Sequence, residues 1–433
     1  MAGNEKAKAR FIMSWGRTYQ TEGKLLSMRM KRLIGQRAKP LFYHPQGMGN
    51  YFTYREAIDI LGWEHTDVYK GGRIDLDPAD WSDLGWMCSY IGPPPSAVEE
   101  MKKRCVPENF GPYPPDLLSE LRDLAAEVKF GRPRGDDFEV IGVEGAQGGI
   151  GYTYLTFLNP GDEVLMPDPC YPCNRHFVRL FDGEAVSIPV DASTAYQLNA
   201  DLIRRHWTKR TVAVLLASPS NPTGTLISSN KMAEIVRTVT ELGGVLIVDE
   251  IYHGLVYGEE AVTALSQSPE VFVVNSFSKY YGMTGWRLGW LVAPMAYIPS
   301  IDKLAQNIFL ASSTVAQHAA LAAFTPGVQE ELAQRRNIFR ERRDYLLPAL
   351  RELGFIIPVV PTGAFYLYAD CSSFTDDSQA LALDLLERAG VAVTPGLDFG
   401  CHQAARHARF SYANTLENLR EGVSRLRDYF TKI

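Results

Sequence analysis

The sequence predicts an α/β protein built around a mostly parallel β-sheet, and two observations lead to that prediction. From about Asp137 onward, short apolar runs typical of strands buried on both faces alternate with longer segments of helical pattern. Several runs also end in turns rich in glycine, proline or polar residues, as strands do at the edge where an open α/β sheet binds ligands. The runs are FEVIGV (138–143), DEVLMPD (162–168), EAVSIPV (184–190), TVAVLLA (211–217), VLIVD (245–249) and VFVVN (271–275).

The composition is that of an ordinary globular enzyme. The chain has 433 residues, 46% of them hydrophobic and 22% charged, which is enough to bury a large core in two or three compact units. A formal net charge of −6 argues against general nucleic-acid binding by the whole molecule. The sequence has no run of about 18 apolar residues, and its first residues lack the apolar centre of a signal peptide. We therefore expect a cytoplasmic protein that does not insert into membranes.

Six cysteines in a chain of this length do not form a disulfide framework. Cys170 and Cys173 have the C-x-x-C spacing of redox and zinc sites, but no second pair and no histidine cluster accompanies them. The sequence therefore predicts structural or incidental cysteines and no metal site.

The amino-terminal arm, residues 1–46, is basic. Its first 40 residues hold ten lysines and arginines against two glutamates, a balance of +8. Such an arm is able to bind DNA, as in regulators that fuse a DNA-binding module to an enzyme-like domain. The arm also contains apolar residues such as Phe11, Trp15 and Leu33, and no compact helix-turn-helix pattern precedes Gly47. We therefore favour a helix that packs on a partner subunit.

The stretch SFSKYYGMTGWRLGW, Ser276 to Trp290, follows a predicted strand and carries the strongest functional signal. It places Lys279 just past the carboxyl end of that strand, where an α/β sheet binds ligands. Ser276, Ser278 and Arg287 offer hydroxyl and guanidinium donors suited to a phosphate group. An amine beside a phosphate pocket suggests a Schiff base to a phosphorylated aldehyde, which is the chemistry of pyridoxal phosphate.

Other strand ends supply partners for such a cofactor. Asn221 lies on the turn after one strand, where its amide is able to donate to an oxygen of the cofactor ring. Asp249 ends the run VLIVD, and an acid there is costly unless it meets a cation or a donor, which the pyridinium nitrogen supplies. Because the strands are parallel, Asn221, Asp249 and Lys279 are expected at the same edge of the sheet. A glycine-rich turn at 145–149 adds backbone N–H groups that face an anion.

The pattern S-F-S-K-x-x-G-M-T-G-W-R-L-G resembles the cofactor-lysine signature of the class I and II aminotransferases, which are pyridoxal-phosphate enzymes of fold type I. The sequences GAFYLY (363–368), VTPGLDFG (393–400) and ARFSYA (408–413) resemble further landmarks of that family. The resemblance implies a large domain with a mostly parallel seven-stranded sheet flanked by helices, and a smaller α+β domain built from both chain ends. The expected division is the arm at 1–46, the amino-terminal part of the small domain and the active-site approach at 47–110, the cofactor domain at 111–330 and the carboxyl-terminal small domain at 331–433.

The resemblance also assigns roles to individual residues. It implies that the catalytic residues are Lys279, which holds pyridoxal phosphate and moves the α-proton, Asp249 at the ring nitrogen, and Tyr252, which acts with Asn221 at the ring hydroxyl. The cofactor phosphate is expected at Gly145, Ala146, Gln147, Ser276, Ser278 and Arg287, the ring against Tyr171, and the substrate carboxylate at Arg409 with Asn221. Cis peptide bonds are expected at Asp168–Pro169 and Asn221–Pro222.

The family shares active-site groups between subunits, so the resemblance implies a homodimer. A tyrosine of the family reaches the phosphate of the neighbouring subunit, but here Phe110 occupies the closest position and Tyr113 lies three residues later, so that contact stays unassigned. Trp81, Trp86 and Tyr90 either line the substrate pocket or fill a core.

Transamination between an α-amino acid and a 2-oxo acid is the leading predicted reaction. The same residues also support elimination, replacement or ring formation at the β- or γ-carbon, as in relatives that resemble aminocyclopropane-carboxylate synthase. A regulator that senses the cofactor without turnover is the hypothesis from another class. No second arginine can be placed for an acidic side chain, so the sequence does not indicate which amino acid is used.

Overall fold

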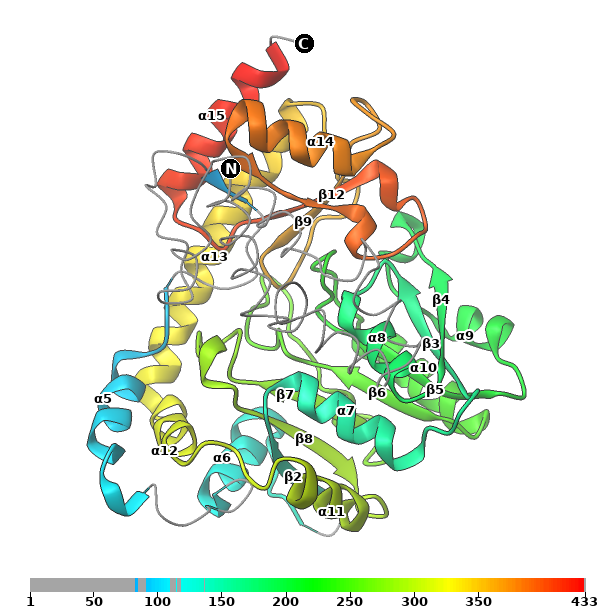
Figure 1. Ribbon diagram of the computed structural model, residues 1–433, viewed down its shortest axis with the longest axis vertical. Helices are drawn as coiled ribbons and strands as arrows, with labels where there is room; N and C mark the ends of the chain where they lie inside the picture. Colours follow the sequence, from blue (N-terminus) through cyan, green and yellow to red (C-terminus); the bar gives the residue numbers. More distant parts are fainter. Residues whose placement is uncertain (1–81, 85–90, 110–113, 115–117, 136, 432–433) are drawn as a thin grey trace, which may run out of the picture.

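The computed structural model describes residues 82–84, 91–109, 114, 118–135 and 137–431 (Figure 1). The predictions for the arm and for Trp81, Trp86, Tyr90, Phe110 and Tyr113 concern residues outside these ranges. Within the described ranges, no helix combines the length and the apolar character that a membrane span requires. The chain forms a large sheet with helices on both faces and a smaller group of strands and helices at one end of it (Figure 1).

The large sheet has seven strands in the order β2-β8-β7-β6-β5-β3-β4. Neighbouring strands are parallel except at β8, which is antiparallel to both of its neighbours, so the sheet is mostly parallel as predicted. Each predicted apolar run forms a strand, whereas β8, which begins in the last residues of the lysine motif, was not predicted. The strands are β2 (Phe138–Val143), β3 (Glu163–Asp168), β4 (Glu184–Pro189), β5 (Thr211–Ala217), β6 (Val245–Asp249), β7 (Phe272–Ser276) and β8 (Gly289–Pro294).

The sheet is buried on both faces, which explains why its strands are apolar at nearly every position. In β6, Leu246 and Val248 pack into a core with α6, α9, α10 and α12, whereas Ile247 packs into a second core with α7, α8 and α11. The helices around the sheet are α5 (Pro95–Arg104), α6 (Ser119–Phe130), α7 (Ala146–Phe157), α8 (Pro172–Leu180), α9 (Ala200–His206), α10 (Ser229–Glu241), α11 (Ile298–Ile308) and α12 (Thr314–Ala323), with short helices η4 (Pro107–Asn109), η5 (Ala192–Thr194), η6 (Ala264–Ser266) and η7 (Thr284–Trp286).

The smaller unit is built from residues that precede the large sheet in the sequence and from residues that follow it, as predicted. β1 (Ser82–Asp83) pairs in parallel with β10 (Val391–Ala392), and a separate antiparallel sheet has the order β11-β12-β9. A third apolar core joins these strands to the surrounding helices. The elements are β9 (Tyr366–Asp370), α14 (Ser378–Asp384), η8 (Leu385–Ala389), β11 (Thr394–Pro395), η9 (Gly396–Asp398), η10 (Ala404–Arg406), β12 (His407–Ser411) and α15 (Leu416–Thr431).

A single helix of 27 residues, α13 (Pro326–Glu352), connects the two units. It runs from beside α5 and α12 to the small sheet (Figure 1), and it continues without a break through the domain boundary predicted at residue 330. Both predicted cis peptide bonds, Asp168–Pro169 and Asn221–Pro222, are present, and a third at Ser218–Pro219 was not predicted.

Candidate active site

The predicted site residues gather at one edge of the large sheet. Asp249 is the last residue of β6, Lys279 follows the end of β7 by three residues, and Asn221 follows the end of β5 by four. Because β5, β6 and β7 are adjacent and parallel, their carboxyl ends meet at the same edge (Figure 1). The structure therefore brings these three strand ends together, in the place where open α/β sheets bind ligands.

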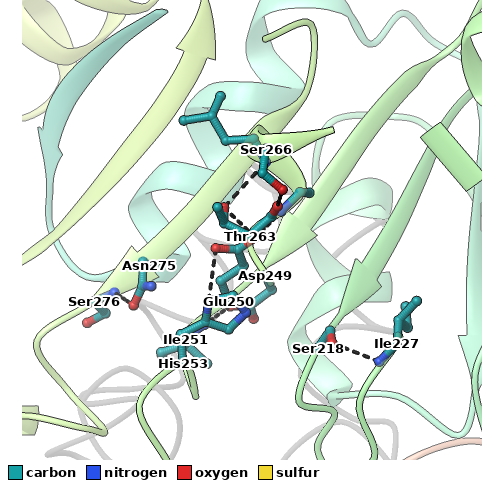
Figure 2. A network of polar contacts seen from close by, with 12 residues as sticks. Ser218, Ile227, Asp249, Glu250, Ile251, His253, Thr263, Ser266, Asn275 and Ser276 are labelled. Carbon is teal, nitrogen blue, oxygen red and sulfur yellow. Dashed lines mark hydrogen bonds and ion pairs between the residues drawn. The ribbon is translucent and has the colours of Figure 1, made fainter. Parts of the chain in front are cut away.

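Asp249 is a buried acid with only 6% of its surface exposed. Its Oδ1 accepts a hydrogen bond of 3.0 Å from the backbone N–H of Ile251 (Figure 2). Burial raises the pKa of Asp249 to about 6, whereas this hydrogen bond and the charge of Lys279 act in the opposite direction. A cation placed against the carboxylate would offset the cost of burying its charge.

A second buried acid, Glu250, points to a separate set of donors next to Asp249 (Figure 2). Its Oε1 accepts hydrogen bonds from Thr263 Oγ1 at 3.0 Å and from the backbone N–H of Ala264 at 2.8 Å, and its Oε2 lies 3.2 Å from His253 Nδ1. Burial raises the pKa of Glu250 to about 8 and lowers the pKa of His253 to about 3. Both groups are thus favoured in their neutral forms at neutral pH, and His253 contacts an acid other than Asp249.

The half-buried Lys129 of α6 lies beside this cluster. Its Nζ is 4.8 Å from the ring centres of both Tyr280 and Tyr281, the two residues that follow Lys279. Burial lowers the pKa of Lys129 to about 8, and the nearby Glu250 acts in the opposite direction. The turn that carries the predicted cofactor lysine therefore packs against a cation from a different helix.

The residues predicted to bind the cofactor phosphate come from two loops that lie against each other. Ser276 Oγ lies 2.8 Å from Ser278 Oγ and accepts from the backbone N–H of Ser278 over 3.0 Å. Arg287 donates from Nη2 to the backbone oxygen of Glu144 over 3.1 Å, which brings its guanidinium to the start of α7. Gly145 precedes that helix with a φ of +76°, and a Cβ on it would lie 2.6 Å from Arg287 Nη2. The positive φ favours glycine here, and the absence of a Cβ leaves room for the guanidinium beside the backbone.

The second and third residues of the same turn are Ala146 and Gln147, which begin α7. Nε2 of Gln147 donates to the hydroxyl of Tyr171 over 3.4 Å and to Sγ of Cys173 over 3.3 Å. The structure thus places Tyr171, which follows the end of β3, next to the turn. Cys170 and Cys173 carry free thiols, so the C-x-x-C pair is not a disulfide.

Asn221 contacts a residue of the small unit, Arg409 on β12. Nη1 of Arg409 donates to Oδ1 of Asn221 over 3.0 Å, and its Nη2 donates to Oγ1 of Thr394 over 3.2 Å. The guanidinium is buried and lies 4.3 Å from the ring centre of Tyr366 and 4.9 Å from that of Phe399. Arg409 is therefore held by an amide, a hydroxyl and two aromatic rings.

Tyr252 completes the predicted set, and its partner was not predicted. Its hydroxyl lies 2.8 Å from the hydroxyl of Tyr366, the ring that also faces Arg409. Burial raises the pKa of Tyr252 well above its ordinary value, so the hydroxyl keeps its proton. Tyr366 thereby links Tyr252 to Arg409.

The residues that sequence reasoning missed are Glu250, Lys129 and Tyr366. The sequence does contain a signal for Glu250. Two consecutive acids stand at the end of a buried apolar strand, and only one of them can face the cofactor ring, so the other needs a different partner. Tyr366 lies in the landmark GAFYLY, where the alternation of a strand does not tell which tyrosine faces the site. Nothing in the sequence connects Lys129 with residues 250 and 280.

Comparisons with known proteins agree with this geometry. Residues 89–426 match the family model for aminotransferases of class I and II. The chain is 38% identical over 315 residues to a valine–pyruvate aminotransferase of Mycobacterium tuberculosis, a match that covers 71% of this chain and 80% of the relative. It is 33% identical over 390 residues to a probable aspartate/prephenate aminotransferase of Aquifex aeolicus, covering 87% of this chain and 93% of the relative.

Solved structures give the same result. The fold matches an aminotransferase from Mycobacterium tuberculosis with a TM-score of 0.79 and 32% sequence identity, over 90% of this chain and 99% of that one. It matches the aspartate aminotransferase of Thermus thermophilus with maleate with a TM-score of 0.76 and 29% identity, over 86% of this chain and 95% of that one.

Proposed function

The chain belongs to the family of class I and II aminotransferases, and we propose that the residues at the carboxyl edge of its large sheet are the active site. The protein is a pyridoxal-phosphate-dependent enzyme that transfers amino groups between an amino acid and a 2-oxo acid. The observation that carries the proposed site is the convergence of Asn221, Asp249 and Lys279 from three adjacent parallel strands.

Three features of this edge fit the cofactor. The buried carboxyl group of Asp249 suits the ring nitrogen, because a pyridinium cation would offset its burial. The amide oxygen of Asn221 is engaged by Arg409, which leaves the amide nitrogen to donate to the ring hydroxyl. Gly145 has no Cβ, so the space beside the guanidinium of Arg287 stays open. A phosphate can therefore approach both the guanidinium and the start of α7.

The bound cofactor supplies an electron sink for the charge that develops at the substrate α-carbon. Lys279 would hold the cofactor between turnovers, and its amine, when free, would accept and return the α-proton. Asp249 keeps a proton on the ring nitrogen. Arg409 binds the α-carboxylate through its guanidinium. Tyr252, hydrogen-bonded to Tyr366, acts with Asn221 at the ring hydroxyl.

The remaining cofactor contacts in the proposal hold its phosphate and ring. Ser276, Ser278 and Arg287 would donate to the phosphate together with the backbone of the turn Gly145, Ala146 and Gln147, where the dipole of α7 favours negative charge. Tyr171 would pack against the ring. Its contact with Gln147 supports this role, since it ties the stacking residue to the phosphate turn.

We infer a cytoplasmic homodimer. Three consecutive apolar residues, Ile308, Phe309 and Leu310, are 56%, 52% and 49% exposed, which favours a partner that covers them. The proposal keeps the basic arm as a further interface element rather than a DNA-binding segment. The five cysteines of the described ranges are all free, which is typical of a reducing compartment. The domain boundaries predicted at 46, 110 and 330 stay part of this proposal.

The experiment that tests the proposed site combines turnover with labelling. Purified protein is incubated with amino acid and 2-oxo acid pairs, and the new amino acid and new 2-oxo acid are both quantified. Valine with pyruvate is one pair, because the mycobacterial relative is named for it, and aspartate with a 2-oxo acid is another. Borohydride reduction and peptide mapping are expected to place the cofactor on Lys279, and a label on another lysine would refute the site.

The same experiment separates the alternative reactions. Elimination, replacement or ring formation would consume the amino acid without forming a matched pair of products, and a regulator would show spectral changes without turnover. None of the comparisons supports these alternatives, and the relatives named above are aminotransferases.

A further inference from the structure

Two buried side chains of the large unit form hydrogen bonds with the backbone of one loop of the small unit, residues 398–402. Arg175, on α8, donates from Nη2 to the backbone oxygen of Asp398 over 2.7 Å and from Nη1 to that of Phe399 over 3.1 Å. Asp168, the last residue of β3, accepts from the backbone N–H of Cys401 at 3.0 Å and 3.1 Å on its two oxygens and from that of His402 over 3.2 Å. We call Asp168, Arg175 and this loop the clamp.

Arg175 and Asp168 bind opposite kinds of backbone group on the two halves of the loop. A guanidinium only donates hydrogen bonds, so Arg175 takes the carbonyl groups, and an ionised carboxylate only accepts them, so Asp168 takes the N–H groups. Asp168 and Arg175 are 5% and 7% exposed, which means that these backbone groups compensate polar side chains taken out of water. A Cβ on Gly400 would overlap Oδ1 of Asp168, so the close approach requires glycine there.

The clamp contacts both halves of the proposed site. The segment from Asp168 to Arg175 carries Tyr171, the proposed stacking residue, and the backbone N–H of Cys170 donates to the oxygen of Phe399 over 2.9 Å. On the other side, the ring of Phe399 lies 4.9 Å from the guanidinium of Arg409. The position of Phe399 is therefore fixed from the cofactor side, and it borders the proposed substrate-binding arginine.

We propose that Asp168 and Arg175 are positioning residues for the substrate carboxylate, because together they hold the loop that places Phe399 against Arg409 and so fix the direction in which that guanidinium presents its N–H groups. This inference rests on the proposed role of Arg409. In this proposal the side chains of Asp168 and Arg175 contact neither the reacting atoms nor the cofactor phosphate. The clamp acts on substrate affinity more than on the chemical step.

The main test uses Arg175→Lys and Arg175→Gln, with Arg179→Lys on the exposed part of the same helix as the matched control. Neither lysine nor glutamine reproduces the planar fork that reaches two carbonyl groups. We expect both Arg175 variants to raise the KM for the amino acid at least about tenfold, while kcat falls less than about threefold. The control is expected to change neither constant, and cofactor content and labelling of Lys279 are expected to match the wild type.

A double-mutant cycle tests whether the clamp acts through Arg409. In an Arg409→Lys background, adding Arg175→Gln is expected to raise KM by no more than about twofold, because the group that the clamp positions is already gone. Full additivity of the two effects would overturn the proposal. Hydrogen–deuterium exchange supplies a readout without substrate, since the amides of Cys401 and His402 are expected to exchange faster in Asp168→Asn.

The two levels of the proposal fail in different ways. An unchanged KM in folded, cofactor-loaded Arg175→Lys and Arg175→Gln, alongside a raised KM in Arg409→Lys, overturns the clamp alone. An unchanged KM in Arg409→Lys itself overturns the proposed substrate site. Should Arg175→Gln lose cofactor or fold poorly, the comparison rests on Arg175→Lys and Asp168→Asn, whose KM must rise for the clamp to stand.

Discussion

Nη1 of Arg409 donates a hydrogen bond to Oδ1 of Asn221 over 3.0 Å, although 188 residues separate them in the sequence. Asn221 follows a strand of the large sheet and Arg409 lies on a strand of the small one. The contact fixes which atom of the amide is oxygen, since a guanidinium only donates. It therefore directs the amide nitrogen of Asn221 away from Arg409 and links the proposed cofactor and substrate sites.

Replacement of Arg409 by lysine is expected to weaken substrate binding. A lysine keeps the charge but loses the paired N–H groups, and charge-assisted hydrogen bonds contribute about 1.5–3 kcal/mol each. We expect the KM for the amino acid to rise about 10- to 100-fold, with the cofactor content unchanged. Steady-state kinetics measure the effect, and Arg406→Lys, at an exposed position three residues earlier, is the control. An equal rise of KM in both variants would contradict the assignment.

Replacement of Lys279 by arginine is expected to abolish turnover. Arginine stays protonated and forms no Schiff base, so the variant loses both the attachment of the cofactor and the base that moves the α-proton. Proton transfer by a positioned group contributes about 10²- to 10⁴-fold, so we expect kcat to fall at least about 10³-fold. Single-turnover kinetics at saturating cofactor give the measurement. The control is Lys303→Arg on the exposed side of α11, and residual activity near the wild-type level in Lys279→Arg would exclude the proposed role.

A methyl group at Gly145 is expected to weaken cofactor binding. It would lie 2.6 Å from Nη2 of Arg287, on a backbone with φ of +76° that side chains rarely adopt. We expect Gly145→Ala to raise the Kd of pyridoxal phosphate at least about tenfold, since charge-assisted hydrogen bonds from Arg287 contribute about 1.5–3 kcal/mol each. Equilibrium titration of the apoprotein provides the value.

The matched control for that substitution is Gly151→Ala, further along the same helix. There a Cβ would meet the ring of Phe177 at 3.8 Å, which is ordinary contact, and alanine favours the helix by up to about 1 kcal/mol. We expect Gly151→Ala to bind the cofactor as the wild type does. Equal loss of affinity in both variants would show that helix α7, rather than the approach of Arg287, is what the first substitution disturbs.

The sequence was sufficient to predict the parallel sheet, the same-edge placement of the three strand ends and two cis peptide bonds. The sheet and the strand ends follow from local pattern and from rules that hold for every open α/β sheet, whereas the cis bonds were expected from the resemblance to the family. It was not sufficient for β8, because this strand begins in the last residues of the lysine motif, and no turn signal marks its start. The charge pattern of residues 328–353 also predicts a helix that bridges to a small domain, as α13 does, but helical periodicity does not mark where one core ends and the next begins.

The partners of the site residues could not be predicted for a different reason. The contacts of Tyr252 with Tyr366 and of Arg175 with Phe399 join positions 114 and 224 residues apart. Such pairs depend on how the small unit is docked on the large one, which periodicity and local motifs do not encode. The landmarks identified which segments matter, but not which side chain of each segment faces the other unit.

The buried pair formed by Glu250 and His253 predicts a pH dependence of stability. The pKa of Glu250 in the folded protein is about 8, above its ordinary value of 4.5, so the folded state holds a proton that the unfolded state has lost across this interval. Stability from Glu250 is therefore fully present below pH 4.5 and is lost as the pH rises toward 8. The lowered pKa of His253, about 3, has the opposite sign, but only below its ordinary 6.5.

The interval from pH 6.5 to 8 thus isolates Glu250. The raised pKa of Asp249, about 6, acts below this interval, and the lowered pKa of Lys129, about 8, acts above it. Glu250→Gln keeps the acceptor for Thr263 and Ala264 and supplies a donor to His253, but it cannot ionise. The variant is therefore a neutral mimic of the protonated acid.

We expect the free energy of unfolding of the wild type, relative to Glu250→Gln, to fall by about 2 kcal/mol between pH 6.5 and 8, at about 1.4 kcal/mol per pH unit. Urea unfolding of both proteins in the same cofactor state measures this difference in unfolding free energy. Any pH dependence of cofactor binding is common to both proteins and cancels in the difference. Glu259→Gln, at an exposed position after the same strand, controls for the loss of a carboxylate. A difference that stays constant over this interval would mean that Glu250 is ionised in the folded protein, because the folded and unfolded states would then carry the same charge at this position.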